Sequence, residues 1–196
     1  MNLKSIVLTT TLIAAATSPM AQAEPATYEI DRDHFSIAFF VEHIGYQDQA
    51  GMFLEASGEF VYDEAANSLE SGEVIIEADS VFTNHDRRDR HLRGDDFLDS
   101  KEHDTIRFTA GDWQPGSDGE GRLTGQLTLL GETRPVALDV TLNKSAPYPF
   151  GHKQPTLGFS ARTTIRRSDW GMTYGVEEDL VGDEVELRFE FEAIRQ

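Results

Sequence analysis

Apolar residues alternate with polar ones along most of this chain, and that period of two constrains the fold more than any other feature. The clearest case is the run from 185 to 191, where Val185, Leu187, Phe189 and Phe191 alternate with glutamates and one arginine. Successive side chains of a strand point to opposite faces of a sheet. Such a run therefore predicts a strand with one apolar face and one charged face.

Similar runs recur at short intervals and are separated by Gly and Asp clusters that are typical of turns. They predict about eight strands, which include residues 37–43, 53–62, 74–78, 106–110, 123–129, 136–142, 159–165 and 185–191. Regularly spaced strands with one apolar face favour an all-β domain, either an antiparallel sandwich or a closed barrel. Residues 147–155 contain several prolines and predict a long loop at one rim.

Helical periodicity is confined to a short stretch around residues 84–98. Asn84 is a residue type that caps helix N-termini, so we expect it to cap this helix. Asp86 with Arg90, and Asp89 with Arg93, are spaced to form favourable pairs one turn apart. The sequence thus predicts one helical excursion from an otherwise β domain.

Residues 1–23 resemble a secretory signal peptide and not a part of the fold. Lys4 precedes an apolar stretch from Ile6 to Ala16 that is too short to span a bilayer, and Ala21-Gln22-Ala23 is typical of a cleavage site. We therefore expect an exported protein with a single domain over residues 24–196 and no stable membrane insertion.

The composition and the motifs argue against several function classes. The formal net charge is −18 and the chain has no cysteine, so we expect no nucleic-acid partner, no disulfide and no cysteine nucleophile. Neither a Gly-x-Ser-x-Gly elbow nor a His-Glu-x-x-His zinc motif is present. The sequence therefore favours a non-enzymatic protein that has no cofactor.

The most highly charged stretch, from Thr83 to Phe97, is the best candidate for a metal site. On a helix His85 and Asp89 would share one face, but His91 would lie well over ~90° away from His85. His34 and His43, nine residues apart on an extended segment, would face opposite sides. These spacings predict no metal site, although a metal-dependent enzyme that uses His85, Asp89 and His91 remains an alternative.

Many of the 12 phenylalanines fall on the inward positions of the predicted strands. A barrel of about eight strands can be filled by its own side chains or can hold one small or slender ligand. The alternation alone favours the filled core.

Several motifs, taken together, resemble the YceI-like family. The most specific one combines Thr83-Asn84, Arg88-Asp89-x-His91-Leu92-Arg93 and Asp96-Phe97-Leu98-Asp99, and others are Tyr28-x-Ile30-Asp31, Gly51-x-Phe53 and Arg167-Ser168-Asp169-Trp170-Gly171. The resemblance implies an eight-stranded antiparallel lipocalin-like barrel with a short helical excursion and an elongated apolar channel. It also implies a periplasmic protein that binds a long polyisoprenoid lipid, such as an isoprenoid quinone or its precursor, and that could form a homodimer.

The apolar face and the resemblance together predict the site residues. We expect the channel to be lined by Ile37, Phe39, Val41, Phe60, Ile76, Phe108, Leu127, Leu129, Leu138, Phe159 and Phe189. We expect a structural lid built from Asn84, Arg88, Asp89, His91, Leu92 and Phe97, with local pairing of its charged groups. The alternative is a stress-response barrel with a filled core and no ligand.

Overall fold

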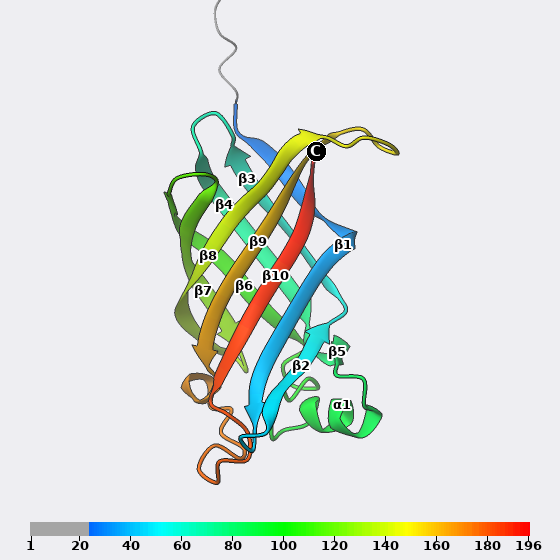
Figure 1. Ribbon diagram of the computed structural model, residues 1–196, viewed down its shortest axis with the longest axis vertical. Helices are drawn as coiled ribbons and strands as arrows, with labels where there is room; N and C mark the ends of the chain where they lie inside the picture. Colours follow the sequence, from blue (N-terminus) through cyan, green and yellow to red (C-terminus); the bar gives the residue numbers. More distant parts are fainter. Residues whose placement is uncertain (1–23) are drawn as a thin grey trace, which may run out of the picture.

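The computed structural model describes residues 24–196, so the predicted signal peptide lies outside the described residues. Ten strands and one short α-helix form the domain (Figure 1). Their bounds are β1 (Ala26–His43), β2 (Gln47–Phe53), β3 (Ala56–Asp63), β4 (Ser68–Glu77), β5 (Val81–Phe82), α1 (Asp86–Leu92), β6 (Thr105–Pro115), β7 (Glu120–Leu129), β8 (Glu132–Pro147), β9 (Pro155–Arg166) and β10 (Glu184–Arg195). Within this range no helix is long and apolar enough to cross a membrane.

Eight of the strands close into an antiparallel barrel. The order around it is β10, β9, β8, β7, β6, β4, β3 and β1, and pairing of β10 with β1 closes the ring. Four of the eight neighbouring pairs, β3–β4, β6–β7, β7–β8 and β8–β9, are connected directly by hairpins, and all pairings around the ring are antiparallel. The predicted eight-stranded antiparallel barrel is confirmed.

The long strand β1 explains the two additional strands. Its first residues, 26–29, pair with β3, while residues 37–43 pair with β2. The strands β2 and β3 thus lie one after the other along β1, and the two-residue strand β5 pairs with the outer edge of β2. This arrangement places α1 beside β2 and β5, at the end of the barrel opposite the C-terminus (Figure 1).

The helix is shorter than predicted and begins one residue later. His85 is the N-cap, because its side chain accepts a hydrogen bond from the backbone N–H of Arg88. Asn84 instead adopts a positive φ of 60°, which asparagine tolerates better than most residues, so its predicted role as the cap is wrong.

The two predicted ion pairs of this helix are also absent from the described residues. Asp89 accepts hydrogen bonds from Thr83, and Arg93 donates to the carbonyl oxygens of Asp79 and Val81. Groups outside the helix therefore take the place of the ion-pair partners that were predicted for Asp89 and Arg93 within it.

Candidate functional site

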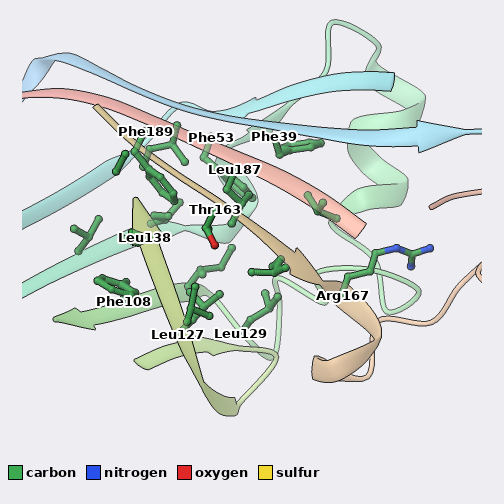
Figure 2. A pocket seen from close by; sticks show the side chains of 18 of the residues that line it. Phe39, Phe53, Phe108, Leu127, Leu129, Leu138, Thr163, Arg167, Leu187 and Phe189 are labelled. Atoms are coloured by element: carbon green, nitrogen blue, oxygen red, sulfur yellow. The ribbon is translucent and has the colours of Figure 1, made fainter. Parts of the chain in front are cut away.

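The interior of the barrel contains an elongated apolar cavity. Its volume is about 530 Å³, and side chains from all eight barrel strands line it (Figure 2). All eleven residues predicted to line the channel do so, and they are Ile37, Phe39, Val41, Phe60, Ile76, Phe108, Leu127, Leu129, Leu138, Phe159 and Phe189. The filled core that alternation alone favours is therefore wrong.

Three of the lining aromatic rings, those of Phe39, Phe108 and Trp113, lie against the barrel wall over a glycine. A Cβ atom at Gly51 would come within 2.0 Å of the Phe39 ring, and one at Gly125 within 2.3 Å of the Phe108 ring. The missing side chains give each ring a place on the neighbouring strand. The rings consequently cover the backbone of the wall without crossing the middle of the barrel.

The end of the barrel near the C-terminus is closed by a separate group of buried side chains. Tyr28, Tyr62, Leu157 and Ala193 form this cluster, with Phe60 stacked on Tyr28 at a ring separation of 5.4 Å. The hydroxyl group of Tyr28 donates a 2.6 Å hydrogen bond to Glu64. The cavity reaches this cluster, because Tyr62 and Phe60 also line it, and it extends from there towards α1.

At the opposite end the segment from Thr83 to Phe97 lies against the cavity. Arg88, His91, Leu92 and Phe97 are lining residues, whereas Asn84 and Asp89 are not. Asp89 is nevertheless buried, and its carboxylate accepts hydrogen bonds from the backbone N–H and the hydroxyl group of Thr83. Arg88 donates to the hydroxyl and carbonyl oxygens of the same threonine. The charged groups that composition marks as a candidate active site are therefore engaged in holding this segment in place.

Aromatic contacts connect the segment from Thr83 to Phe97 with the segment between β9 and β10. The His91 imidazole packs edge-on against both Phe97 and Tyr174, at ring separations of 5.0 and 5.1 Å. The other side of His91 is held by Asp96, whose Oδ2 lies 2.9 Å from Nε2. His85, Asp89 and His91 thus each have a different partner, and they do not converge on a common point.

Replacing Asp89 by Ala is expected to lower the free energy of unfolding by about 2–3 kcal/mol, because two buried Thr83 donors lose their charged acceptor. Thermal unfolding should move down by roughly 5–10 °C for a domain of this size. Asp86→Ala is the matched control, since Asp86 is exposed on the same helix and should change stability by less than about 1 kcal/mol. Equal effects of the two changes, measured by calorimetry, would contradict the role assigned to Asp89.

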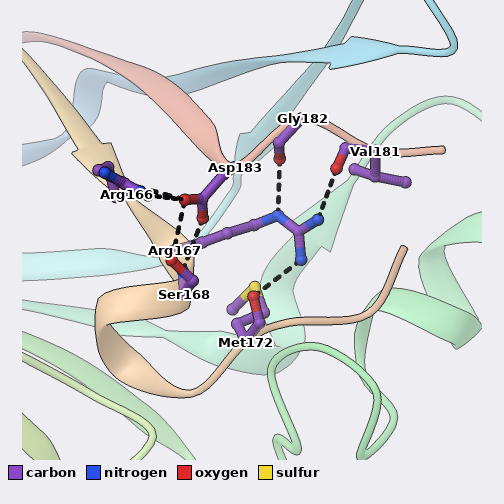
Figure 3. A network of polar contacts seen from close by, with 7 residues as sticks. All are labelled: Arg166, Arg167, Ser168, Met172, Val181, Gly182 and Asp183. Atoms are coloured by element: carbon purple, nitrogen blue, oxygen red, sulfur yellow. Dashed lines mark hydrogen bonds and ion pairs between the residues drawn. The ribbon is translucent and has the colours of Figure 1, made fainter. Parts of the chain in front are cut away.

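A second polar centre organises the same end of the barrel. Arg167 is 3 % exposed and donates hydrogen bonds of 2.8–2.9 Å to four carbonyl oxygens. Figure 3 shows the bonds to Met172, Val181 and Gly182, and the fourth acceptor is Tyr174. Burial lowers the pKa of its guanidinium, but the four carbonyl dipoles compensate the charge. Arg167 therefore ties the residues 172–182 to the end of β9. The sequence indicates Arg167 only through the family resemblance, because an arginine after an alternating run is usually exposed.

Comparison with known proteins identifies the family. The model of the YceI-like domain matches residues 28–193, which is nearly the whole described chain. The chain belongs to the YceI-like family. Curated relatives include UPF0312 proteins from Pseudomonas aeruginosa strain LESB58 (35% identical over 188 residues, 94% of this chain and 95% of the relative) and from Pectobacterium carotovorum strain PC1 (36% identical, 94% and 93%).

Solved structures of similar proteins have the same fold. BcnA of Burkholderia cenocepacia superposes with a TM-score of 0.74 at 20% identity and covers 83% of this YceI-like chain and 98% of its own. The YceI protein of Campylobacter jejuni gives 0.72 at 27% identity, with 79% and 90% covered. A polyisoprenoid-binding domain from Saccharophagus degradans gives 0.64 at 16% identity, with 88% and 100% covered.

The structure of this YceI-like chain also brings together a group of side chains that sequence reasoning missed. Asp31, His34 and Glu192 lie within one small patch on the outside of the barrel, with His34 Nδ1 2.8 Å from Asp31 Oδ2 and 4.0 Å from Glu192 Oε2. An uninterrupted strand would separate Asp31 from His34, but the β1–β10 register shifts between Ile30 and Phe35. The signals in the sequence are the spacing Asp-x-x-His and the family motif Tyr28-x-Ile30-Asp31 that precedes it.

The contact between Asp31 and His34 shifts the pKa of both side chains. The hydrogen bond to Asp31 raises the pKa of His34 above its usual value. Burial by itself would raise the pKa of Asp31, but the hydrogen bonds from His34 and from the backbone of Asp33 outweigh it and lower this pKa. The charged pair therefore stabilises the bulge at pH values between the lowered pKa of Asp31 and the raised pKa of His34. We expect an NMR titration of His34 in Asp31→Asn to give a lower pKa than in the wild type. An unchanged value would show that the two side chains do not interact in solution.

Proposed function

We propose that this protein is a non-enzymatic binding protein that holds a long polyisoprenoid lipid, an isoprenoid quinone or its precursor, in the barrel cavity. The observation that carries the proposal is the elongated cavity of about 530 Å³ with an almost wholly apolar lining. This volume lies within the range of about 300–1,000 Å³ that small-molecule sites occupy. A slender, flexible and apolar ligand matches both the shape and the chemistry of the lining.

The energetics support a ligand that makes few polar contacts. Burial of a methylene group contributes about 0.8 kcal/mol, whereas association costs about 4–15 kcal/mol. A prenyl chain that buries roughly twenty carbons therefore binds tightly without an ion pair. The similarity to the Saccharophagus degradans domain described as polyisoprenoid-binding points to the same class of ligand.

The proposed setting is the periplasm, where the protein would carry or sequester the lipid. The expected signal peptide supports this location, as does the strongly acidic composition, which disfavours adhesion to anionic membranes. The predicted homodimer is not needed for this role, because one chain provides the entire cavity described here.

Native mass spectrometry with a series of prenols tests the proposed function. Farnesol, geranylgeraniol and solanesol differ only in the number of isoprene units, and each additional fully buried unit of five carbons should tighten binding by up to nearly a thousandfold until the cavity is full. The corresponding straight-chain alcohols serve as controls for unspecific adsorption. Affinity that does not depend on chain length, or no binding of any prenol, would contradict a prenyl-binding cavity.

A further inference from the structure

A bulge in β1 stands opposite a single residue of β10. Ile30 pairs with Ala193 and Phe35 pairs with Phe191, so four residues, 31–34, span the distance that Glu192 spans alone. Bulges of this kind redirect side chains away from the regular alternation of a strand. Here the bulge places Asp31 and His34 next to Glu192, at the seam where the barrel closes.

The three side chains present one ligand atom each to a common point. His34 Nδ1, Asp31 Oδ2 and Glu192 Oε2 all lie within 4.8 Å of one another. Ligand atoms bound at about 2.0–2.2 Å around a single ion lie only about 3–3.6 Å apart, so small side-chain rotations are sufficient to complete the site. Within residues 24–196 neither carboxylate forms an ion pair with a lysine or an arginine that would compete for it.

One oxygen of Glu192 retains unused acceptor capacity, although His34 Nδ1 lies 4.0 Å from it. The Glu192 Oε2 atom is shielded from solvent and has no hydrogen-bond partner among the described residues. Shielded acceptors without partners are rare, and a bound ion is one of the few explanations. Glu192 as a whole is partly exposed, so an ion can reach this oxygen without any opening of the barrel.

The hairpin between β8 and β9 borders the same patch. Tyr148 lies beside His34 at a ring separation of 6.4 Å, and His152 stacks on Tyr148 at 4.6 Å. His152 uses Nδ1 to accept a hydrogen bond from the backbone N–H of Gln154, so its other ring nitrogen carries the proton and is not a metal ligand. The Tyr148 hydroxyl also faces this patch, because Glu192 and Asp31 both contribute, after burial, to the raised pKa of Tyr148.

We propose that Asp31, His34 and Glu192 form a site for a divalent transition-metal ion of the Zn²⁺ class. One imidazole and two carboxylates suit Zn²⁺, whereas Ca²⁺ and Mg²⁺ prefer ligand sets made of oxygen alone. The ion connects the bulge of β1 to β10 across the closing seam. Because the ligands come from both strands, only the folded barrel binds the ion, and binding stabilises it.

Calorimetric titration of the metal-free protein with Zn²⁺ tests this site. We expect one Zn²⁺ per chain and a higher unfolding temperature with Zn²⁺ but not with Ca²⁺. Asp31→Asn and Glu192→Gln keep the side-chain shape on the outer surface and should each weaken binding at least tenfold. Asp33→Asn is the matched control, since it removes the same charge from the same bulge without removing a ligand atom.

The pH dependence provides a second readout. His34 must lose its proton to bind the ion, and Asp31, Asp33 and Glu192 all favour the protonated form. Because the ligands must be deprotonated, Zn²⁺ affinity should fall as the pH is lowered. The site is excluded if the wild type binds no Zn²⁺ at millimolar concentration. It is also excluded if Asp33→Asn weakens binding as much as Glu192→Gln, because the acidic surface alone would then attract the ion.

Discussion

Replacing Ala161 by Trp is expected to abolish prenyl binding while the barrel stays folded. Ala161 is the smallest side chain apart from glycine on the part of β9 that lines the cavity, and it pairs with Phe189 and Val140 on the two adjacent strands. An indole at this position has to project into the cavity. If it displaces roughly five carbons of the ligand at about 0.8 kcal/mol each, affinity falls by nearly a thousandfold, as about 1.4 kcal/mol corresponds to a factor of ten.

The comparison with Thr164→Trp separates a blocked cavity from a damaged fold. Thr164 is exposed on the outer face of the same strand, so a tryptophan there leaves the cavity unchanged. Ala161→Val adds less volume and should produce an intermediate loss. The cost of Ala161→Trp to the free energy of unfolding should not exceed about 1–3 kcal/mol, because the ring enters space that is already open. Retained prenyl binding in folded Ala161→Trp would show that the ligand lies elsewhere.

Replacing Arg167 by Met is expected to produce the largest loss of stability. Four carbonyl groups, of which that of Met172 is buried, lose their common donor, and we expect the free energy of unfolding to fall by about 3–5 kcal/mol. Denaturant unfolding followed by circular dichroism measures this change directly. Limited proteolysis should at the same time find new cleavage within residues 172–182, since Arg167 is what holds this segment to β9.

Arg166 provides the matched control for that experiment. It is the adjacent arginine, but its side chain is 65% exposed and forms a 3.0 Å ion pair with Asp183 (Figure 3). An exposed pair contributes only about 0–1 kcal/mol, so Arg166→Met should leave stability almost unchanged. Arg167→Lys keeps the charge but cannot reach four carbonyl oxygens, and it should resemble Arg167→Met. A stability of Arg167→Lys close to that of the wild type would mean that charge matters and geometry does not.

The period-two pattern predicts which residues face the cavity but not that a cavity exists. Phe39, Phe108 and the other lining residues are inward because alternation decides the face of a strand. Whether inward side chains meet in the middle depends on how the rings lie, and the rings over Gly51 and Gly125 lie against the wall. That arrangement depends on contacts between strands, which a single sequence does not reveal.

Local departures from regular structure account for the remaining errors. Asn84 is a residue type that caps helices well, but it has a positive φ here and the cap is His85. The hydrogen bonds between Thr83 and Asp89 fix the position of the helix relative to the residues before it. The sequence predicts a regular extended strand at His34. The structure has a bulge there, which brings His34 to Asp31 and Glu192 and depends on pairing with β10. In both cases tertiary contacts override a preference that is local in sequence.

The most direct test of the account is chemical analysis of the protein purified from its own host. The protein is extracted with organic solvent, and mass spectrometry identifies and quantifies what the cavity has retained. We expect a polyisoprenoid lipid at about one molecule per chain in the wild type and in Thr164→Trp, and none in Ala161→Trp. Wild-type protein that yields no lipid, or that yields the same lipids as Ala161→Trp, would contradict the proposed role of the cavity.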